Sequence, residues 1–257
     1  TVATTMHLVS RVSATARGGM PARALATAFD AVVFDKDGTL LDFAATWNPA
    51  IYDAICESAG SDGQLRARIA NVLGFDMALR EPLPEAPVVH MGNSELIELL
   101  TPHTDGRALL DAAAAKVVAH VTPAAHASEL LRALRDADIP CAVATNDEDR
   151  STREQLGALG WLGSEHEPAL ISAVRCCDSG HGAKPEPGMV LSAAAALGAA
   201  PSRVAMVGDS AADLVAGRRA GFAAVILVGP EASVGRHEGL ADVWIRDLGG
   251  LLQPPAE

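Results

Sequence analysis

Two aspartates separated by one residue are the groups in this chain best suited to covalent chemistry. Asp35 and Asp37 lie in the motif DKDGT, directly after the apolar run Ala31–Phe34. A free Asp carboxylate has a pKa of about 3.9, so Asp35 is ionised at neutral pH and needs no base to make it a nucleophile. Asp37 could donate a proton to a leaving group and later accept one from water. The two residue types at this spacing are therefore suited to a displacement in two steps.

Three other polar clusters follow apolar runs further along the chain. They contain Thr145 with Asn146, Lys184 with Pro185, and Asp209 with Asp213 in the motif GDSAAD. Ligands of open α/β sheets bind at the carboxyl ends of the strands, so we expect all four clusters to meet at one edge of a sheet. Acids gathered there would repel one another, whereas carboxylate oxygens suit a hard cation such as Mg²⁺, which can also bind an anionic substrate. The clusters are therefore compatible with a Mg²⁺ site at this edge.

Each cluster also has an explanation without catalysis. The Asp-Gly pair at 37–38 could turn a β-hairpin, and residues 145–146 could turn a strand into a helix. The Lys-Pro pair at 184–185 fits a loop ahead of a helix that begins with proline. Residues 210–213 fit a capping box, which would explain Asp213 by itself. We favour a shared site, because four such coincidences at successive strand ends are hard to explain separately.

The elements that would position these clusters are short apolar runs alternating with helical stretches. The expected strands are Ala31–Phe34, Cys141–Thr145, Leu170–Val174, Val204–Val207, Ala223–Val228 and Val243–Ile245. The expected helices between them are Ala125–Ala137, Glu148–Leu159, Pro187–Leu197 and Ala211–Ala220. Almost uniformly apolar strands are typical of parallel sheets that are covered on both faces. We therefore expect an α/β fold with a doubly wound parallel sheet.

The chain between the first strand and the helix at Ala125 lacks this alternation. It has helical periodicity and no convincing strand, with helices expected at Ser94–Leu100 and Leu109–Val121. The segment Glu81–Pro87 holds three prolines and is predicted to be a loop. A helical block inserted after the first strand indicates a separate cap domain. We expect residues 28–43 and 124–250 to form the catalytic core, and residues 44–123 to form the cap.

Composition limits the classes of protein to which the chain could belong. Its 257 residues carry a formal net charge of −12, with 4% aromatic and 49% hydrophobic residues. This balance argues against a nucleic-acid partner, which favours basic and aromatic surfaces, and no apolar run is long enough to span a membrane. The four cysteines form no CxxC motif, which favours free thiols and a reducing, cytoplasmic compartment.

The first 29 residues differ from the rest of the chain. They contain three arginines and no acid, so the remaining residues carry the whole negative charge. They lack an apolar segment of signal-peptide length, although their Arg, Ser and Thr content loosely resembles an organellar transit peptide. We expect residues 1–27 to form a mobile N-terminal extension.

Taken in order, the four clusters resemble the motifs of the haloacid dehalogenase superfamily of aspartate-nucleophile phosphohydrolases. DxDGT, a strand-ending Thr145, the Lys-Pro pair at 184–185 and GDxxxD at 208–213 carry the resemblance, which covers about residues 29–247. The first motif and the helical insertion are most similar to the phosphoglycolate-phosphatase-like branch. The resemblance implies a Rossmann-like core with an inserted α-helical cap. Dehalogenases of this superfamily lack the second aspartate, so Asp37 favours phosphate over halide.

The resemblance also implies a role for each residue of the clusters. Asp35 would be the nucleophile and Asp37 the acid and base, while Lys184 would supply a fixed positive charge. Mg²⁺ would be held by the side chains of Asp35 and Asp209 and the backbone carbonyl of Asp37. The phosphoryl oxygens would be bound by Thr145, Lys184 and N–H groups near Asn146. Asp213 would orient Lys184 or a metal-bound water.

These roles imply a Mg²⁺-dependent phosphatase that acts on a small phosphorylated metabolite, with 2-phosphoglycolate as the leading candidate. Two alternatives stay open. The same core could serve a phosphomutase of the β-phosphoglucomutase type, or a non-catalytic module that binds a phosphorylated ligand. Phosphoserine phosphatases share the core pattern as well. The expected assembly is a monomer or a homodimer.

Overall fold

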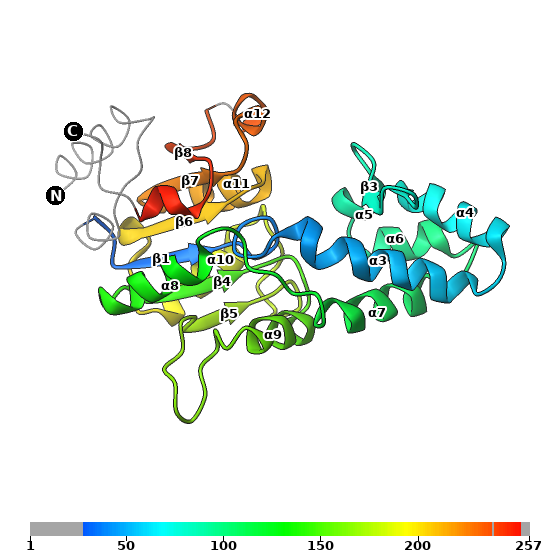
Figure 1. Ribbon diagram of the computed structural model, residues 1–257. Helices are drawn as coiled ribbons and strands as arrows, with labels where there is room; N and C mark the ends of the chain where they lie inside the picture. The colour runs from blue at the N-terminus through cyan, green and yellow to red at the C-terminus, as the bar shows by residue number, and fades with distance from the viewer. Residues whose placement is uncertain (1–27, 238, 253–257) are drawn as a thin grey trace. The chain divides into compact units, whose positions relative to one another are not determined.

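A six-stranded parallel sheet forms the centre of the larger of two compact units (Figure 1). The structure is a computed structural model that describes residues 28–237 and 239–252, so the expected N-terminal extension lies outside the described residues. In spatial order the strands are β5 (Ala173–Arg175), β4 (Cys141–Ala144), β1 (Ala31–Phe34), β6 (Val204–Gly208), β7 (Ala224–Val228) and β8 (Val243–Ile245). The chain winds outward on both sides of β1, which confirms the predicted doubly wound sheet.

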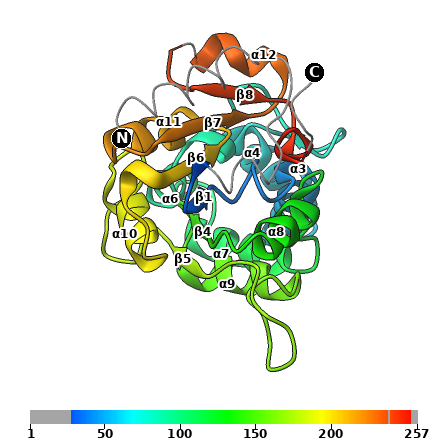
Figure 2. The ribbon, with the colours of Figure 1, turned by 90° about the vertical axis from the view of Figure 1, so that its left-hand side faces the viewer.

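Helices cover both faces of this sheet (Figure 2). On one face lie α10 (Gly188–Ala196) and α11 (Ala211–Arg219), and on the other lies α8 (Ala127–Asp136), while α9 (Asp149–Ala158) packs beside β5. These four helices begin and end within two residues of the predicted bounds. The remaining helical segments are α12 (Glu231–Val234) and the 3₁₀ turns η1 (Pro201–Arg203), η2 (Gly235–His237) and η3 (Leu248–Leu251). Covering on both faces explains why every residue of β1, β4 and β6 is buried.

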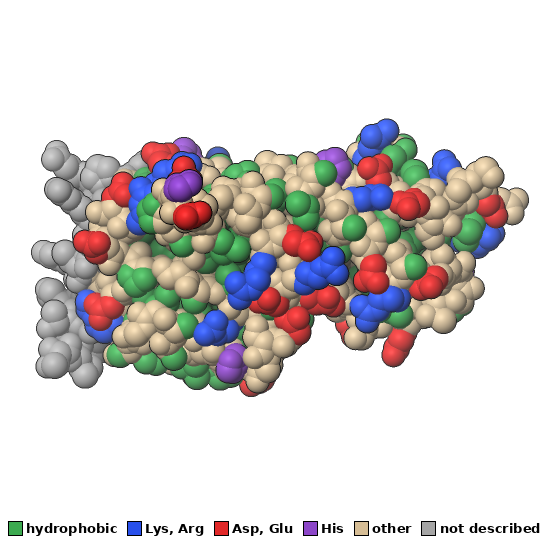
Figure 3. Space-filling model, turned by 90° about the horizontal axis from the view of Figure 1, so that it is seen from below, with side chains coloured by type: hydrophobic (Ala, Val, Ile, Leu, Met, Phe, Trp, Pro, Cys, Tyr) green, Lys and Arg blue, Asp and Glu red, His purple; other side chains and the backbone are tan. Residues whose placement is uncertain are grey.

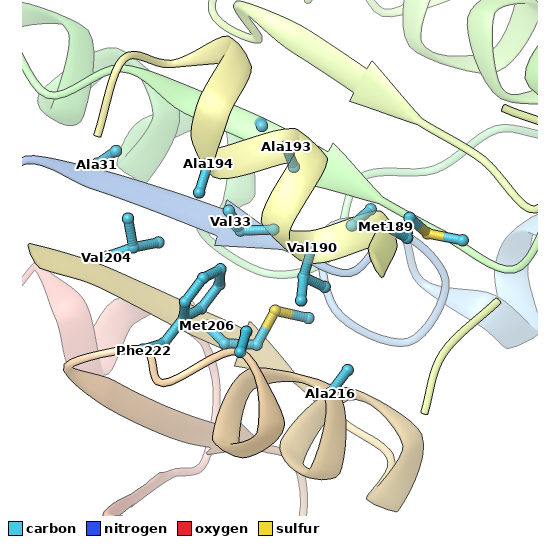
Figure 4. Packing of buried hydrophobic residues seen from close by; sticks show 13 residues of the cluster. Ala31, Val33, Met189, Val190, Ala193, Ala194, Val204, Met206, Ala216 and Phe222 are labelled. Atoms are coloured by element: carbon cyan, nitrogen blue, oxygen red, sulfur yellow. The ribbon is translucent and has the colours of Figure 1, made fainter. Parts of the chain in front are cut away.

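Small and branched side chains make up the core on the α10 face of the sheet (Figure 4). Ala31 and Val33 of β1 lie in one cluster with Val190 and Ala194 of α10 and Met206 of β6. Alanine side chains let the helix approach the strands closely, and burial of each larger apolar side chain contributes about 1.5–3 kcal/mol. This packing fixes the two strands whose ends carry Asp35 and Asp209.

The predicted strand Leu170–Val174 begins three residues too early, because pairing with β4 begins at Ala173. The N–H groups of Leu170 and Ile171 both donate to the carbonyl of Trp161, at 2.9 and 3.0 Å. These two apolar residues therefore close the loop after α9 instead of extending the sheet. Both residues are buried and apolar, so in the sequence they looked like the start of a buried strand.

Residues Phe43–Thr122 form the second compact unit, which is mostly helical. Its helices are α3 (Phe43–Ala59), α4 (Gly63–Leu73), α5 (Pro87–His90), α6 (Asn93–Leu100) and α7 (Gly106–Val117). Helix α3 packs against α4 and α7 around an apolar cluster that includes Ile55, Ile69 and Leu109. This unit has its own core, as an independently packed domain requires.

The expectation that the insertion contains no strand is wrong, and the loop predicted at Glu81–Pro87 is shorter than expected, covering residues 83–86. Strands β2 (Phe75–Asp76) and β3 (Glu81–Pro82) pair in antiparallel fashion. The Asp76 carboxylate accepts hydrogen bonds from the N–H groups of Ala78 and Leu79, at 2.8 and 2.9 Å, and this turns the chain between the two strands. Strands of two residues are too short to show a period of two, so the sequence carried no signal for them.

Charged side chains of both signs lie side by side on the molecular face shown in Figure 3. Two pairs on α9 are of this kind, with Arg153 at 2.7 Å from Asp149 and Arg150 at 3.0 Å from Glu154. Exposed pairs of this type stabilise a helix only slightly. Across residues 28–237 and 239–252, no helix combines the length and the apolar character needed to cross a membrane. The four cysteines are free thiols.

Candidate active site

Four loops, which follow the neighbouring strands β5, β4, β1 and β6, bring the predicted residues to one edge of the sheet. Asp35 directly follows β1, and its N–H donates to the carbonyl of Val207 in β6 at 2.9 Å. Thr145 follows β4 and Asp209 follows β6, which are the two strands on either side of β1. Asp35 therefore occupies the central position among the strand ends, at the point where the sheet winds in both directions.

The amino group of Lys184 is surrounded by oxygen atoms at this edge. Its Nζ lies 2.5 Å from Oδ1 of Asp35, 2.6 Å from Oδ1 of Asp213 and 2.7 Å from the carbonyl oxygen of Ala144. An ammonium group has three N–H donors, so these three oxygens match its capacity. Lys184 and both carboxylates are almost completely buried, which keeps water from screening their charges. The nucleophile candidate is thus held by a fixed positive charge.

Asn146 determines where the backbone of Lys184 lies. Its Oδ1 accepts from the N–H of Lys184 at 2.9 Å, and its Nδ2 donates to the carbonyl of the same residue at 3.0 Å. The loop that carries Lys184 is therefore joined to the end of β4 through one side-chain amide. The geometry gives this side chain a contact with Lys184, while sequence analysis expected the residue to lie against phosphate.

Asp213 has two sets of contacts, one for each carboxylate oxygen. Its Oδ2 accepts from the N–H and the hydroxyl of Ser210, at 3.1 and 2.6 Å, and the bond from the N–H belongs to the capping box at the start of α11. Its Oδ1 faces Lys184. The capping box indicated by the sequence is present, and the same side chain contacts the lysine of the site as well.

The turn after Asp35 does not form a hairpin. Strand β1 pairs with β4 and β6, both in parallel, so the hairpin alternative for the Asp-Gly pair is wrong. Gly38 has a φ of +83°, and its N–H donates to the carbonyl of Leu41 at 2.9 Å. A Cβ atom at Gly38 would overlap the carboxylate of Asp209. Glycine is required here both for its backbone conformation and for the close approach of Asp209.

Burial and crowding change the protonation of the carboxylates at the site. Burial raises the pKa of Asp35 to about 7, against the opposing effect of Lys184. Burial, with the negative charges of Asp35 and Asp213, raises the pKa of Asp209 to about 8. For Lys184, burial alone would lower the pKa, but Asp213 and Asp35 outweigh it and raise the pKa above its ordinary value. The site holds more negative charge than its own lysine balances.

The donor atoms of the site fit a divalent cation such as Mg²⁺. Carboxylate oxygens of Asp35, Asp209 and Asp213 all lie within 4.8 Å of one another. Because Asp213 engages Lys184 and Ser210, Asp35 and Asp209 are the carboxylates best placed to bind a metal. Hard oxygen donors are what Mg²⁺ prefers, and a cation would favour the ionised form of both groups.

Thr145 is buried, and its hydroxyl oxygen accepts from the N–H of Asp147 at 3.2 Å. A hydroxyl that accepts one hydrogen bond can still donate its own hydrogen to another group. This arrangement suits a donor to a phosphoryl oxygen at the end of β4.

Sequence reasoning missed a second lysine of this region. Lys36 is fully buried, and its Nζ lies 2.9 Å from Oδ2 of Asp37, 2.8 Å from Oδ2 of Asp147 and 2.5 Å from Oε1 of Gln155. Burial would lower the pKa of Lys36, but Asp37 and Asp147 raise it, so the amino group stays charged. The available signal was a lysine between the two motif aspartates in a chain with only three lysines.

Comparison with known proteins agrees with this geometry. The family model described as haloacid dehalogenase-like hydrolase matches residues 29–221. An N-acetylmuramic acid 6-phosphate phosphatase from Pseudomonas aeruginosa is 30% identical over 203 residues, which cover 74% of this chain and 78% of that protein.

Solved structures share the fold at lower identity. CbbY from Rhodobacter sphaeroides, in complex with phosphate, has a TM-score of 0.61 and 20% identity, covering 87% of this chain and 99% of that one. A HAD phosphatase from Thermococcus onnurineus has a TM-score of 0.60 and 23% identity, covering 86% and 94%. Together with the family match, these likenesses confirm the resemblance expected from the motifs. The chain belongs to the haloacid dehalogenase-like hydrolases.

Proposed function

We propose that this hydrolase is a Mg²⁺-dependent phosphatase that cleaves a small phosphorylated metabolite through an aspartyl-phosphate on Asp35. The observation that carries the proposal is the contact between Asp35 and Lys184, 2.5 Å apart and both buried at the end of β1. A carboxylate held in one direction by a fixed cation is an oriented nucleophile. The same cation would counter the charge that an incoming phosphate brings.

In the first step, an Asp35 carboxylate oxygen attacks phosphorus, and the bond from phosphorus to the ester oxygen breaks. Asp37 donates a proton to the departing alkoxide, which leaves as an alcohol. Thr145 donates its hydroxyl hydrogen to a phosphoryl oxygen, and Lys184 holds the nucleophile. Mg²⁺, bound by Asp35, Asp209 and the carbonyl of Asp37, would neutralise charge on the phosphoryl group.

In the second step, Asp37 is ionised and accepts a proton from water. The resulting hydroxide attacks phosphorus, the bond to Asp35 breaks, and inorganic phosphate is released. Asp37 is protonated again at the end and ready for the next substrate. One residue therefore serves as acid and then as base, and the free enzyme is restored.

Two substrates have support, and both carry a carboxylate as well as a phosphate ester. The sequence motifs favour 2-phosphoglycolate, and the 30% identical relative favours N-acetylmuramic acid 6-phosphate. We assign residues 44–123 as the cap that selects the leaving group, since inserted lids of this kind exclude water from the reaction. Fold alone does not determine the substrate.

A phosphate-release assay over a panel of phosphorylated metabolites tests the proposal. The panel includes both candidates and 4-nitrophenyl phosphate, each measured with Mg²⁺ and with a chelator. We expect Mg²⁺-dependent release that Asp35→Asn abolishes and that Arg203→Met, an exchange at the opposite edge of the sheet, leaves unchanged. Activity that survives Asp35→Asn would contradict the mechanism. An isomerised sugar phosphate without released phosphate would instead establish the phosphomutase alternative.

A further inference from the structure

Lys36 lies between the two motif aspartates, but its side chain makes contacts that differ from those of Lys184. Its Nζ is 2.9 Å from the Asp37 carboxylate and has no exposed surface. Asp37 itself keeps 21% of its side-chain surface exposed, as a group that must meet a substrate and a water requires. The buried ammonium group of Lys36 therefore forms an ion pair with the partly exposed carboxylate of Asp37.

Two residues from another part of the chain hold Lys36 in this position. The carboxylate of Asp147, in the loop after β4, lies 2.8 Å from the amino group. Gln155, on the buried face of α9, accepts from it through Oε1 at 2.5 Å. The amide of Gln155 is oriented by its own Nε2, which donates to the hydroxyl of Ser151 at 2.8 Å. Lys36 is thus held independently of Asp37.

We propose, building on the phosphatase function above, that Lys36 is a positioning residue that fixes the carboxylate of Asp37 for proton transfer. Proton transfer needs donor and acceptor atoms within hydrogen-bond distance and correctly aligned. A partly exposed Asp on a turn has several rotamers, and an ion pair to a lysine that Asp147 and Gln155 hold in place favours one of them. Each of the two motif aspartates then has its own buried lysine, Lys184 for the nucleophile and Lys36 for the acid and base.

The dependence on the leaving group tests this role. The value of kcat/KM includes steps up to the departure of the leaving group, where an alkoxide needs the proton from Asp37 and 4-nitrophenolate does not. We expect Lys36→Met to lower kcat/KM for an alkyl phosphate about tenfold more than for 4-nitrophenyl phosphate. This factor is smaller than the whole contribution of a general acid, because Asp37 itself is still present. Equal losses on the two substrates, or a higher kcat/KM on the alkyl phosphate, would overturn the proposal.

A double-mutant cycle with Asp37→Asn gives the second readout. With 4-nitrophenyl phosphate, kcat still includes hydrolysis of the aspartyl-phosphate, which needs Asp37 as base. If Lys36 acts through Asp37, Lys36→Met lowers kcat in the natural background and causes no further loss beside Asp37→Asn. Additive losses would show a separate structural effect and overturn the proposal.

Matched variants make both outcomes interpretable. Arg203→Met removes a basic side chain that pairs with Asp30 at the opposite edge of the sheet, and it should leave kcat and kcat/KM unchanged. If Lys36→Met does not fold, Gln155→Met removes one support of Lys36 and enters the same cycle with Asp37→Asn, where additivity again overturns the proposal. Failure of the phosphatase function is seen separately, because the natural enzyme would then release no phosphate.

Discussion

Oδ1 of Asp213 lies 2.6 Å from the amino group of Lys184, while the other oxygen of the same carboxylate caps the first turn of α11. One buried side chain thus joins the start of a helix to the lysine that holds Asp35. The position of Lys184 depends on α11 through this contact and on the end of β4 through Asn146. Lys184 is therefore held both by the loop after β4 and by the first turn of α11.

Replacing Asp213 should therefore affect both stability and activity. Asp213→Ala removes a cap and leaves the buried Lys184 with one carboxylate fewer, so we expect the free energy of unfolding to fall by about 3 kcal/mol or more. We also expect kcat to fall. Asp105→Ala is the matched control, because Asp105 accepts from the N–H of Ala108 at 3.0 Å and is an ordinary N-cap of α7.

The control should lose about 1 kcal/mol and keep its kcat, as removal of an ordinary N-cap does. Denaturant unfolding and steady-state kinetics measure both quantities. If Asp213→Ala behaved like Asp105→Ala, the contact with Lys184 would have no role.

Gly38→Ala should separate a steric effect at the site from backbone strain. Both Gly38 and Gly198 have positive φ angles, of +83° and +69°, but a Cβ at Gly198 meets nothing within 4 Å. We expect each Ala variant to lose about 1–2 kcal/mol of stability from the left-handed backbone. Only Gly38→Ala should lose activity, by about 10²-fold, because its methyl group displaces Asp209. Equal activity in both variants would exclude this close approach.

The location of the candidate site followed from the sequence, whereas its side-chain pairings did not. Strands buried on both faces are apolar runs, so polar residues such as Asp35 and Thr145 stand out where a run ends. Lys36 gave no sign of its partners, because Gln155 lies 119 positions away and meets it only through the packing of α9 on the sheet. Asp213 showed its cap in the local pattern, but its contact with Lys184 depends on tertiary structure.

The Mg²⁺-free protein should become less stable as the pH rises from about 4 to 8. In the folded chain burial raises the pKa of Asp35 to about 7 and that of Asp209 to about 8, while both titrate near 3.9 when unfolded. Over this range the folded state binds more protons than the unfolded state, so the free energy of unfolding falls as protons leave. Mg²⁺ binds the ionised carboxylates and should raise Tm more at pH 8 than at pH 5.

Melting curves of the natural chain and of Asp209→Asn, each with chelator and with Mg²⁺, measure this effect. In Asp209→Asn, Tm should fall less steeply as the pH rises and should increase less on addition of Mg²⁺, because one of the two carboxyl groups has been removed. Identical pH profiles for the two proteins would contradict the assignment.

Trapping the phosphorylated enzyme tests the central claim most directly. Asp37→Asn should slow the attack of water and let the intermediate accumulate, so this variant is mixed with 4-nitrophenyl phosphate and Mg²⁺, quenched in acid and digested. Mass spectrometry should find one phosphoryl group on Asp35, and none after the same treatment of a variant that also carries Asp35→Asn. Release of 4-nitrophenol with no phosphoryl group on Asp35, or with the group on another residue, would contradict the account.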